Sequence, residues 1–391
     1  MKGNQLRTVV ALTALAVATV ARPTPAASIP FELLDNRVVV DVRLDGKGPF
    51  HCILDTGASA AVSVEVAEEL GLAVTPQGES GGVGEALVKT ASATLHSIEL
   101  GGAILRDVPV SVLSFEDFPP VFGTRRIDAV LGDPIFERFV VTTDYVGRTL
   151  AFAAPAQFAY QGPGKVVPFE RPDGIPVVRA TLDGVDGRFG VDTGARSSLL
   201  LFGPFVEAHG LRARYGAHLE GVTGWGIGGP VRSLLARASA LTMGPVTVKD
   251  LVIRLSTQKT GATTGTHLDG LLGPDVLRQF RVIIDYSRRQ LILEPNALHG
   301  QRDTWDRLGA WFVQEGKHFM VLDVIPESPA AEAGLAVGDR VLAVDGTPTS
   351  TLLLPEVRTG MRTRAPGTRV RLKIRSRGSE REVVAIVRDL I

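Results

Sequence analysis

Residues 31–152 and residues 167–294 repeat one order of sequence features, and this repeat is the strongest constraint on the fold. Each copy opens with an alternating strand pattern, turns through Asp-Gly and returns through an apolar strand into Asp-Thr-Gly-Ala. The tetrapeptide begins at Asp55 in the first copy and at Asp192 in the second. A short helix and a glycine-rich segment follow in both copies. We therefore expect two lobes of the same architecture.

The two copies also agree in the spacing of their later features. Ile-Asp-Ala-Val-Leu-Gly ends at Gly132, and Leu-Asp-Gly-Leu-Leu-Gly ends at Gly273. In both copies a phenylalanine lies seven residues beyond this glycine, and Asp-Tyr begins twelve residues beyond it. Equal spacings of this kind indicate the duplication of one structural unit.

Each copy predicts one short helix after its tetrapeptide. The first covers Ser63–Leu70, with Ser63 as the N-cap and Gly71 just beyond the end. The second begins with Pro204 in its first turn and ends at Gly210. Helix content is therefore expected to be small.

The length and composition predict a mainly β protein of several domains. A chain of 391 residues suits two or three domains. Its 43 glycines and 24 prolines, with β-branched runs between them, predict many short strands joined by turns. A net charge of zero gives no electrostatic reason to expect nucleic acid or an anionic membrane as a partner. The segments we expect are a signal peptide over 1–27, a first lobe over 28–152, a linker over 153–166, a second lobe over 167–296 and a further domain over 303–391.

The N-terminal segment is typical of an export signal. Lys2 and Arg7 precede an apolar stretch from Val9 to Val20, and small residues follow as far as Ala27. We expect cleavage near Ala27 and an exported protein, either periplasmic or extracellular. The apolar stretch is shorter than the roughly 20 residues that span a bilayer. A membrane anchor is the alternative if the segment is not cleaved.

Cys52 is the single cysteine of the chain, so no internal disulfide can form. It lies within an apolar run from Phe50 to Leu54, directly before the first tetrapeptide. A buried structural thiol is therefore expected rather than a nucleophile.

Two aspartates in matching surroundings suit acid–base chemistry. When two carboxyl groups lie together, both cannot ionise readily, so the pair shares one proton. The ionised partner can take a proton from a water, and the protonated partner can donate to a peptide carbonyl oxygen. This chemistry needs neither a metal nor another cofactor, and we expect none. Asp55 and Asp192 are the predicted catalytic residues.

The two tetrapeptides, each ending an apolar strand and each followed by a hydrophobic-hydrophobic-Gly triplet, resemble the aspartic peptidases of the retroviral and pepsin type. The resemblance covers residues 31–294. It implies two tandem retropepsin-like lobes that form a pseudo-two-fold dimer within one chain. It also implies that Thr56 and Thr193 lock the two loops through hydroxyl hydrogen bonds. Gly57 and Gly194 would permit the tight backbone path and leave room for substrate.

In this family a flap hairpin covers the catalytic loops. The resemblance therefore assigns flaps to the two glycine-rich segments, at Gly82-Val83-Gly84 and at Gly224-Trp225-Gly226. Such a flap closes over substrate and excludes water. An ordinary flexible loop is the alternative for each segment. Two candidate flaps favour the retroviral arrangement over the pepsin arrangement, which has one.

The residues that follow Gly57 and Gly194 influence the pH at which the predicted enzyme would work. Pepsin-like sites usually carry Ser or Thr there, and its hydroxyl favours the charged carboxylate. Ala58 and Ala195 have no hydroxyl, so we expect a less acidic working range than pepsin's. At the next position the first copy has Ser59 and the second copy has Arg196. We interpret this difference as surface variation rather than as a cationic edge of the cleft.

The last part of the chain resembles a PDZ domain of the bacterial protease-associated kind, with an α+β fold. The resemblance rests on a Ser-Pro-Ala-Ala-Glu-Ala-Gly-Leu run from Ser328 and a Gly-Asp-Arg-Val-Leu-Ala-Val-Asp-Gly run from Gly338. It covers most of 303–391. Basic residues from Arg369 to Arg375 alternate with apolar ones and predict a strand with one solvated face. The loop that would receive a peptide's C-terminal carboxylate falls at Gly309-Ala310-Trp311-Phe312, which departs from the usual Gly-Leu-Gly-Phe form.

These features together predict an aspartic endopeptidase with a tethered PDZ-like module for substrate or partner recognition. The expected partners are peptide or protein substrates, with C-terminal peptides at the PDZ-like domain. A non-catalytic peptide-binding adaptor that keeps the same folds is the alternative. The presence of both aspartates favours the enzyme. Pairing of lobes between chains is a third arrangement, and pairing within one chain is simpler.

Overall fold

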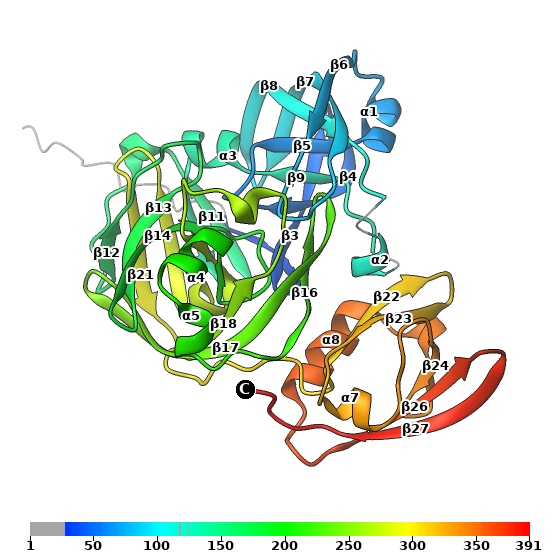
Figure 1. Cartoon of the computed structure of the whole chain (residues 1–391). Helices are drawn as coiled ribbons and strands as arrows, with labels where there is room; N and C mark the ends of the chain where they lie inside the picture. The colour runs from blue at the N-terminus through cyan, green and yellow to red at the C-terminus, as the bar shows by residue number, and fades with distance from the viewer. Residues whose placement is uncertain (1–27, 117–118, 124) are drawn as a thin grey trace, which may run out of the picture.

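The computed structural model describes residues 28–116, 119–123 and 125–391 (Figure 1). The expected signal peptide over 1–27 lies outside these residues. The described chain is mainly β, as predicted, and its sheets comprise one in each lobe, one shared by the lobes and one in the C-terminal domain. Within the described residues, no helix is long and apolar enough to cross a membrane.

Lobe 1 is a partly closed sheet with short helices at its edge. Its strands follow the order β2-β3-β4-β9-β5-β8-β7-β6, and a further pairing joins β3 to β7. Asp45 and Gly46 have φ values of 49° and 73°, which suit the two-residue turn between β3 and β4. The elements are β2 (Glu32–Leu34), β3 (Arg37–Leu44), β4 (Lys47–Leu54), β5 (Ala60–Ser63), α1 (Val64–Leu70), β6 (Thr75–Ser80), β7 (Val88–Leu100), β8 (Ala103–Leu113), α2 (Pro119–Phe122), β9 (Ala129–Leu131) and α3 (Asp133–Arg138).

Lobe 2 repeats this architecture in the order β13-β14-β19-β15-β18-β17-β16, with β13 also pairing with β17. Asp183 and Gly184 form the matching turn, with φ values of 45° and 86°. The elements are β13 (Val177–Leu182), β14 (Val185–Val191), β15 (Leu199–Leu201), α4 (Gly203–Ala208), α5 (Leu211–Arg214), β16 (Glu220–Gly226), β17 (Gly229–Met243), β18 (Val246–Ser256), η2 (Ala262–Thr264), β19 (Gly270–Leu272) and α6 (Pro274–Leu277).

Both predicted helices are confirmed. The Ser63 hydroxyl accepts a hydrogen bond from Val66 N and caps α1, which ends at Gly71 with a φ of 71°. In lobe 2, α4 carries Pro204 in its first turn, and Gly210 follows it with a φ of 57°.

The strand registers of the two lobes correspond residue by residue. Leu54 pairs with Leu131 in lobe 1, and Val191 pairs with Leu272 in lobe 2, in parallel in both cases. The chain therefore leaves each of these strands at the same place in its lobe. This correspondence confirms the duplication that the sequence spacing indicates.

A shared sheet joins the two lobes, in the order β1-β11-β10-β20-β21-β12. At its centre β10 and β20 are antiparallel, and Val141 lies opposite Ile284. The lobes therefore pair within one chain. The segment expected as a linker contains η1 and the start of β12, which pairs with β21. The elements are β1 (Ser28–Pro30), β10 (Val140–Asp144), β11 (Thr149–Ala153), η1 (Pro155–Gln157), β12 (Lys165–Pro168), β20 (Phe280–Asp285) and β21 (Gln290–Pro295).

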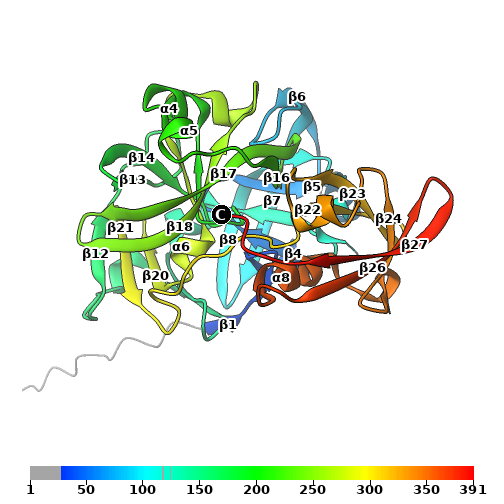
Figure 2. The ribbon, with the colours of Figure 1, turned by 60° about the horizontal axis from the view of Figure 1, so that its bottom comes forward.

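The C-terminal domain has its own sheet and its own apolar core around Phe319. Its strands follow the order β22-β23-β24-β26-β27, so β22 is an edge strand. The basic face of β26 is exposed, as predicted. Figures 1 and 2 show this domain beside lobe 1 and next to β16 of lobe 2. The elements are β22 (Ala310–Glu315), β23 (His318–Val324), α7 (Pro329–Glu332), β24 (Arg340–Val344), β25 (Thr347–Pro348), η3 (Thr349–Thr351), α8 (Leu354–Thr363), β26 (Arg369–Ser376) and β27 (Ser379–Ile386).

A single large apolar core extends through both lobes. Cys52 is fully buried in it as a free thiol, which confirms the structural role predicted for it. Burial raises the pKa of this thiol well above its ordinary value, so it stays protonated and unreactive.

Candidate active site

Two equivalent strands deliver Asp55 and Asp192 to one place between the lobes. Asp55 follows β4, and its backbone N–H donates to the carbonyl of Leu131 on β9 at 2.9 Å. Asp192 follows β14, and its N–H donates to the carbonyl of Leu272 on β19, also at 2.9 Å. The apolar-apolar-Gly triplets that the sequence repeats are therefore the strands that hold the two loops in position.

The threonines after the two aspartates tie the loops together across the lobes. Thr56 Oγ1 donates to Val191 O at 2.6 Å, and Thr193 Oγ1 donates to Leu54 O at 2.9 Å. Each hydroxyl also accepts from the other threonine's N–H, at 3.0 and 3.1 Å. Both side chains are buried. The pattern is reciprocal, so the two loops form one unit.

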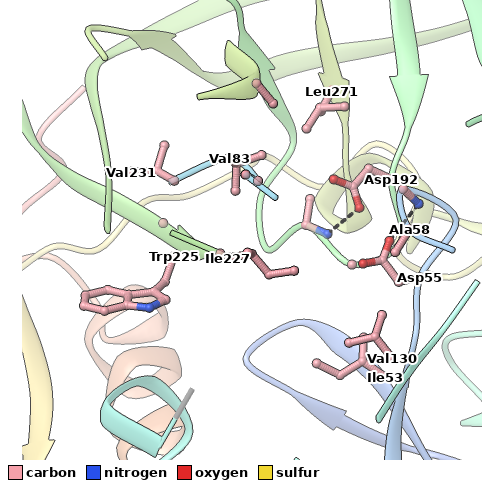
Figure 3. Close-up of a pocket in the computed structure, with 18 of the residues that line it drawn as sticks. Ile53, Asp55, Ala58, Val83, Val130, Asp192, Trp225, Ile227, Val231 and Leu271 are labelled. Carbon is pink, nitrogen blue, oxygen red and sulfur yellow. Dashed lines mark hydrogen bonds between the residues drawn. The ribbon is translucent and has the colours of Figure 1, made fainter. Parts of the chain in front are cut away.

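The carboxyl groups of Asp55 and Asp192 lie side by side (Figure 3). Gly57 N donates to Asp55 Oδ1 at 2.7 Å, and Ala195 N donates to Asp192 Oδ1 at 2.8 Å. A Cβ at Gly57 would lie 3.0 Å from Asp192 Cγ, and a Cβ at Gly194 would overlap the Asp55 carboxyl. Only glycine at these two positions leaves room for the pair.

Burial and mutual repulsion set the protonation of this pair. Burial, and after it the charge of Asp192, raises the pKa of Asp55 to about 8. Burial also raises the pKa of Asp192, although its bond from Ala195 N opposes the change. Two adjacent buried carboxyl groups therefore keep a shared proton at neutral pH, so one acid and one base are present together.

A cavity of about 510 Å³ lies over the two carboxyl groups. Its walls are mostly apolar and come from both lobes, as Figure 3 shows for Ile53, Val130 and Leu271. An apolar wall with a few convergent polar groups is typical of a ligand site. Within the described residues, no group of three or more His, Cys, Asp or Glu side chains could hold a metal ion.

Both candidate flaps lie at this cavity and contact each other. Gly84 N donates to Ile227 O at 3.0 Å, and Ala86 N donates to Gly228 O at 3.1 Å. Val83 comes so close to Gly226 that a Cβ there would overlap it. In Figure 3, Val83 and Ile227 lie across the cavity from the aspartates. The flap segments of the two lobes thus meet above the site.

The other repeated aspartates hold strand ends. Asp128 Oδ2 accepts from His51 N at 2.8 Å, and Asp269 Oδ2 accepts from Arg188 N at 2.7 Å. Their positions correspond in the two lobes. These contacts give both aspartates a structural role at equivalent strand ends.

A buried ion cluster next to the site was not foreseen from the sequence. The carboxylate of Asp35 pairs with Arg37 at 3.0 Å and with Arg196 at 2.9 Å, and Arg358 of α8 lies 3.9 Å away. Arg37 Nε donates to Gly194 O at 2.7 Å, and its Nη2 donates to the flap carbonyl of Trp225 at 3.3 Å. Arg37 therefore links the cluster to the loop of Asp192 and to one flap.

The interpretation of Arg196 as surface variation is wrong. Its side chain is only 15% exposed, forms a bidentate pair with Asp35 and lies over the ring of Trp311 at 5.0 Å. It also lines the cavity. The sequence signal was the difference between Ser59 and Arg196, and the fold gives Arg196 a specific role, because its side chain lines a pocket together with Trp311 of the C-terminal domain.

The edge of the C-terminal domain is already in contact with the lobes. Arg358 on α8 donates to Val121 O of α2 at 2.6 Å and to Phe312 O of β22 at 2.7 Å. Trp311 and Val313 of β22 pack with Val222 of β16, and Trp225 packs against the same cluster. Segments of both lobes that border the cavity are therefore held by this domain.

The expected carboxylate loop is held by an internal carboxylate. Asp306 Oδ1 accepts from Leu308 N at 3.0 Å and from Gly309 N at 2.7 Å. Burial raises the pKa of Asp306 to about 6, although these two bonds oppose the change. Trp311 is buried, with a side-chain N–H that has no partner among the described residues.

Two family models match parts of the chain. A family model described as aspartyl protease matches residues 40–135 and 178–276, and one described as PDZ domain matches residues 320–376. The chain is similar to the aspartic proteinase from Irpex lacteus, with 14% identity and a TM-score of 0.47, over 70% of this chain and 98% of that chain. It is also similar to a retropepsin-like aspartic protease from Rickettsia conorii, with 21% identity and a TM-score of 0.25, over 34% of this chain and 96% of that chain. No curated protein matches the chain.

The family model covers most of both repeats, including the strands that carry Asp55 and Asp192. The sheet order confirms the predicted fold, in which two tandem lobes precede a domain with strands and helices. The two lobes of this chain belong to the aspartyl protease family, and the domain that follows them is a PDZ domain.

Proposed function

We propose that this chain is an aspartic endopeptidase that hydrolyses peptide bonds with a water activated between Asp55 and Asp192. The observation that carries the proposal is the adjacency of two buried carboxyl groups, one from each repeat, beneath a cavity of about 510 Å³. Their shared proton makes a base and an acid available at once.

In the proposed reaction the ionised carboxyl takes a proton from the water as the water attacks the peptide carbonyl carbon. The protonated carboxyl donates its proton to the carbonyl oxygen. As the C–N bond of the resulting gem-diol breaks, the leaving nitrogen takes the proton of one carboxyl, and a hydroxyl of the gem-diol gives its proton to the other carboxyl, so the pair regains its single shared proton. The threonine bonds between the loops keep the two carboxyl groups at a fixed separation, and so contribute to catalysis through positioning.

The flap segments would cover the substrate in this reaction. Val83 and Ile227 lie across the cavity from the aspartates, so a peptide would be enclosed between them and the catalytic loops. Exclusion of bulk water strengthens the electrostatic interactions inside the site. The contact between the two flap segments must open for a peptide to enter.

A digest of a defined peptide mixture with purified protein, read by mass spectrometry from about pH 2 to about pH 9, tests this proposal. Because burial raises the pKa of Asp55 to about 8, the pair keeps its proton into the neutral range. We expect cleavage to be greatest in the weakly acidic to neutral range and to fall about tenfold per pH unit above about pH 8. Maximal cleavage below about pH 3 would contradict it.

A non-catalytic adaptor is the competing function. It predicts that wild-type protein cuts no peptide anywhere in this pH range, yet binds peptides with measurable affinity. Peptide binding to the intact chain, measured by fluorescence anisotropy beside the digest, separates the two functions.

We propose that the PDZ domain recognises peptides, and that the protease lobes compete with these peptides for its binding edge. Peptides bind PDZ domains by adding a strand to a sheet edge. Here β22 is that edge, and Arg358 joins its Phe312 carbonyl to Val121 of lobe 1. A peptide must displace this contact before it can pair along β22.

Arg358→Ala is therefore expected to tighten the binding of C-terminal peptides to the full chain. Two hydrogen bonds, each contributing about 1 kcal/mol net, correspond to roughly tenfold or more in affinity. Anisotropy with a labelled library of free C-termini measures the change. Arg369→Ala, on the exposed face of β26, is the matched control and should leave affinity unchanged. Equal affinities for both variants and the wild type would argue against self-competition.

For location, we propose that the protein is exported. The proposal rests on the signal-like residues Lys2 to Ala27 of the sequence. N-terminal sequencing of the mature protein tests it, with a new terminus near residue 28 as the expected result.

A further inference from the structure

Arg254 on β18 is a buried cation in the wall of the cavity. Arg254 is only 4% exposed, and its Nη1 donates to Thr223 O at 3.3 Å. Among the described residues its Nε has no hydrogen-bond partner, and the guanidinium forms no ion pair with a carboxylate. Burial lowers the pKa of Arg254 to about 9, so the guanidinium remains charged at neutral pH.

This guanidinium differs from the other cations near the site. Arg37 and Arg196 share the carboxylate of Asp35, whereas Arg254 lies beside them without such a partner. The charges of Asp275 and Asp192 partly offset the cost of burying Arg254, but neither carboxylate forms an ion pair with it among the described residues. A buried guanidinium without a paired carboxylate remains costly. The position of Arg254 in the wall of the cavity indicates that the charge complement comes from a ligand.

The pseudo-two-fold symmetry gives a natural comparison for the position of Arg254. In lobe 1 Ala61 pairs in parallel with Ser111, and in lobe 2 Leu200 pairs in parallel with Arg254. Ser111 and Arg254 therefore occupy equivalent places, and both line the cavity. One lobe presents a small hydroxyl at this place, and the other presents a cation.

The flap strand next to Arg254 is shaped around its guanidinium. The register of β16 against β17 shifts between Val222 and Gly224, which turns the Thr223 carbonyl toward Arg254. A Cβ at Gly224 would lie only 2.9 Å from Arg254 Nη1. The glycine leaves the room that the guanidinium occupies.

We propose that Arg254 forms a subsite for a carboxylate of the bound peptide, on the lobe 2 side of the cleft. The guanidinium offers a planar set of donors that matches a carboxylate with two parallel hydrogen bonds. The ligand class is therefore a peptide with an acidic side chain near the scissile bond, or one whose C-terminus reaches the cleft. The inference rests on the proposed peptidase function and specifies its substrate.

Matched peptides that differ at one position test this subsite. Each peptide has an amidated C-terminus and carries Glu, Gln or Lys at one of the positions flanking the cut. A second set carries no acidic side chain and a free C-terminus. We expect the wild type to favour Glu over Gln by about 10- to 100-fold in kcat/KM at one position, mainly through KM. A preference for free C-termini instead would assign the same subsite to the terminal carboxylate.

Variants at the two symmetric positions provide the controls. Arg254→Ser, which copies lobe 1, is expected to reduce the Glu to Gln ratio to near one, and Arg254→Lys should keep part of it. Ser111→Ala on the opposite wall should leave the ratio unchanged. A purely structural role for Arg254 would lower cleavage of Glu and Gln peptides equally. An unchanged ratio in Arg254→Ser overturns the subsite.

Equilibrium binding keeps this test separate from the test of the proposed function. If no peptide is cut, the same peptides are titrated onto the full chain and followed by anisotropy. Tighter binding of the Glu peptide, by about tenfold or more and lost in Arg254→Ser, supports the subsite even though the enzyme assignment has failed. Equal affinities of Glu and Gln peptides overturn the subsite.

Discussion

Replacing either Asp55 or Asp192 with asparagine is expected to lower peptide cleavage by at least about 10²- to 10⁴-fold. Each aspartate acts as acid or base in the proposed reaction, and proton transfer by a positioned side chain contributes about this much to the rate. Because the two carboxyl groups share one proton, loss of either one removes both roles. Initial rates on a single fluorogenic peptide, compared with the wild type at its best pH, measure the effect.

Asp173→Asn is the matched control for these variants. Asp173 also lines the cavity but is exposed, and it takes no part in the pair. Its replacement should change the rate by less than about threefold, well below the contribution of proton transfer. Full cleavage by either Asp55→Asn or Asp192→Asn would contradict the intrachain enzyme.

The same variants should not lose activity through unfolding. Burial raises the pKa of Asp55 above the ordinary aspartate value, so the native state binds the proton more tightly than the unfolded chain. Its contribution to stability is complete below about pH 3.9 and is lost as the pH rises through about 8. Asparagine does not titrate, so thermal melts should show Asp55→Asn gaining on the wild type from pH 4 to pH 8.

Asp35→Ala is expected to cause the largest loss of stability among single substitutions near the site. The change leaves Arg37, Arg196 and Arg358 buried without the carboxylate that they share. Removing one partner from a buried ion cluster costs about 3–5 kcal/mol. Urea denaturation followed by circular dichroism measures the free energy of unfolding.

Asp41→Ala serves as the control for Asp35→Ala. Asp41 pairs with His51 through a side chain that is 66% exposed, and such a surface pair contributes about 0–1 kcal/mol. A similar small loss for Asp35→Ala would show that the cluster does not stabilise the fold.

The sign of the pH dependence for Asp35 is opposite to that for Asp55. Burial alone would raise the pKa of Asp35, but Arg196, Arg358 and Arg37 together hold it well below the ordinary value. Its contribution to stability is therefore present above about pH 3.9 and is lost as the pH falls further. The difference between wild type and Asp35→Ala should shrink in that acidic range.

The features that the sequence predicts are those that the duplication repeats. Asp55 and Asp192 stand out because each ends an apolar strand and precedes the same three residues, and the strand registers place them in equivalent positions. The reciprocal bonds of Thr56 and Thr193 follow from the same symmetry. The repeated pattern was sufficient to single out the two aspartates, and the resemblance to aspartic peptidases supplied the role of the threonines.

The residues that break the symmetry could not be placed from the sequence. Asp35 and Arg358 are far apart in the chain and meet only because the PDZ domain docks beside lobe 1. Arg254 lies in an ordinary apolar strand pattern, and only the pairing of β15 with β18 reveals its equivalence to Ser111. Arg196 did give a signal, but its burial depends on a domain that lies more than one hundred residues away in the sequence.

The sheet shared by the two lobes makes the order of synthesis matter. β10 emerges from the ribosome with lobe 1, but its partner β20 is made only after most of lobe 2. Until then β10 presents an unpaired strand edge, on which another nascent chain can pair through the same backbone groups. The completed chain closes this edge with its own second half. Protection of this edge from aggregation thus depends on the synthesis and folding of the last strands of lobe 2.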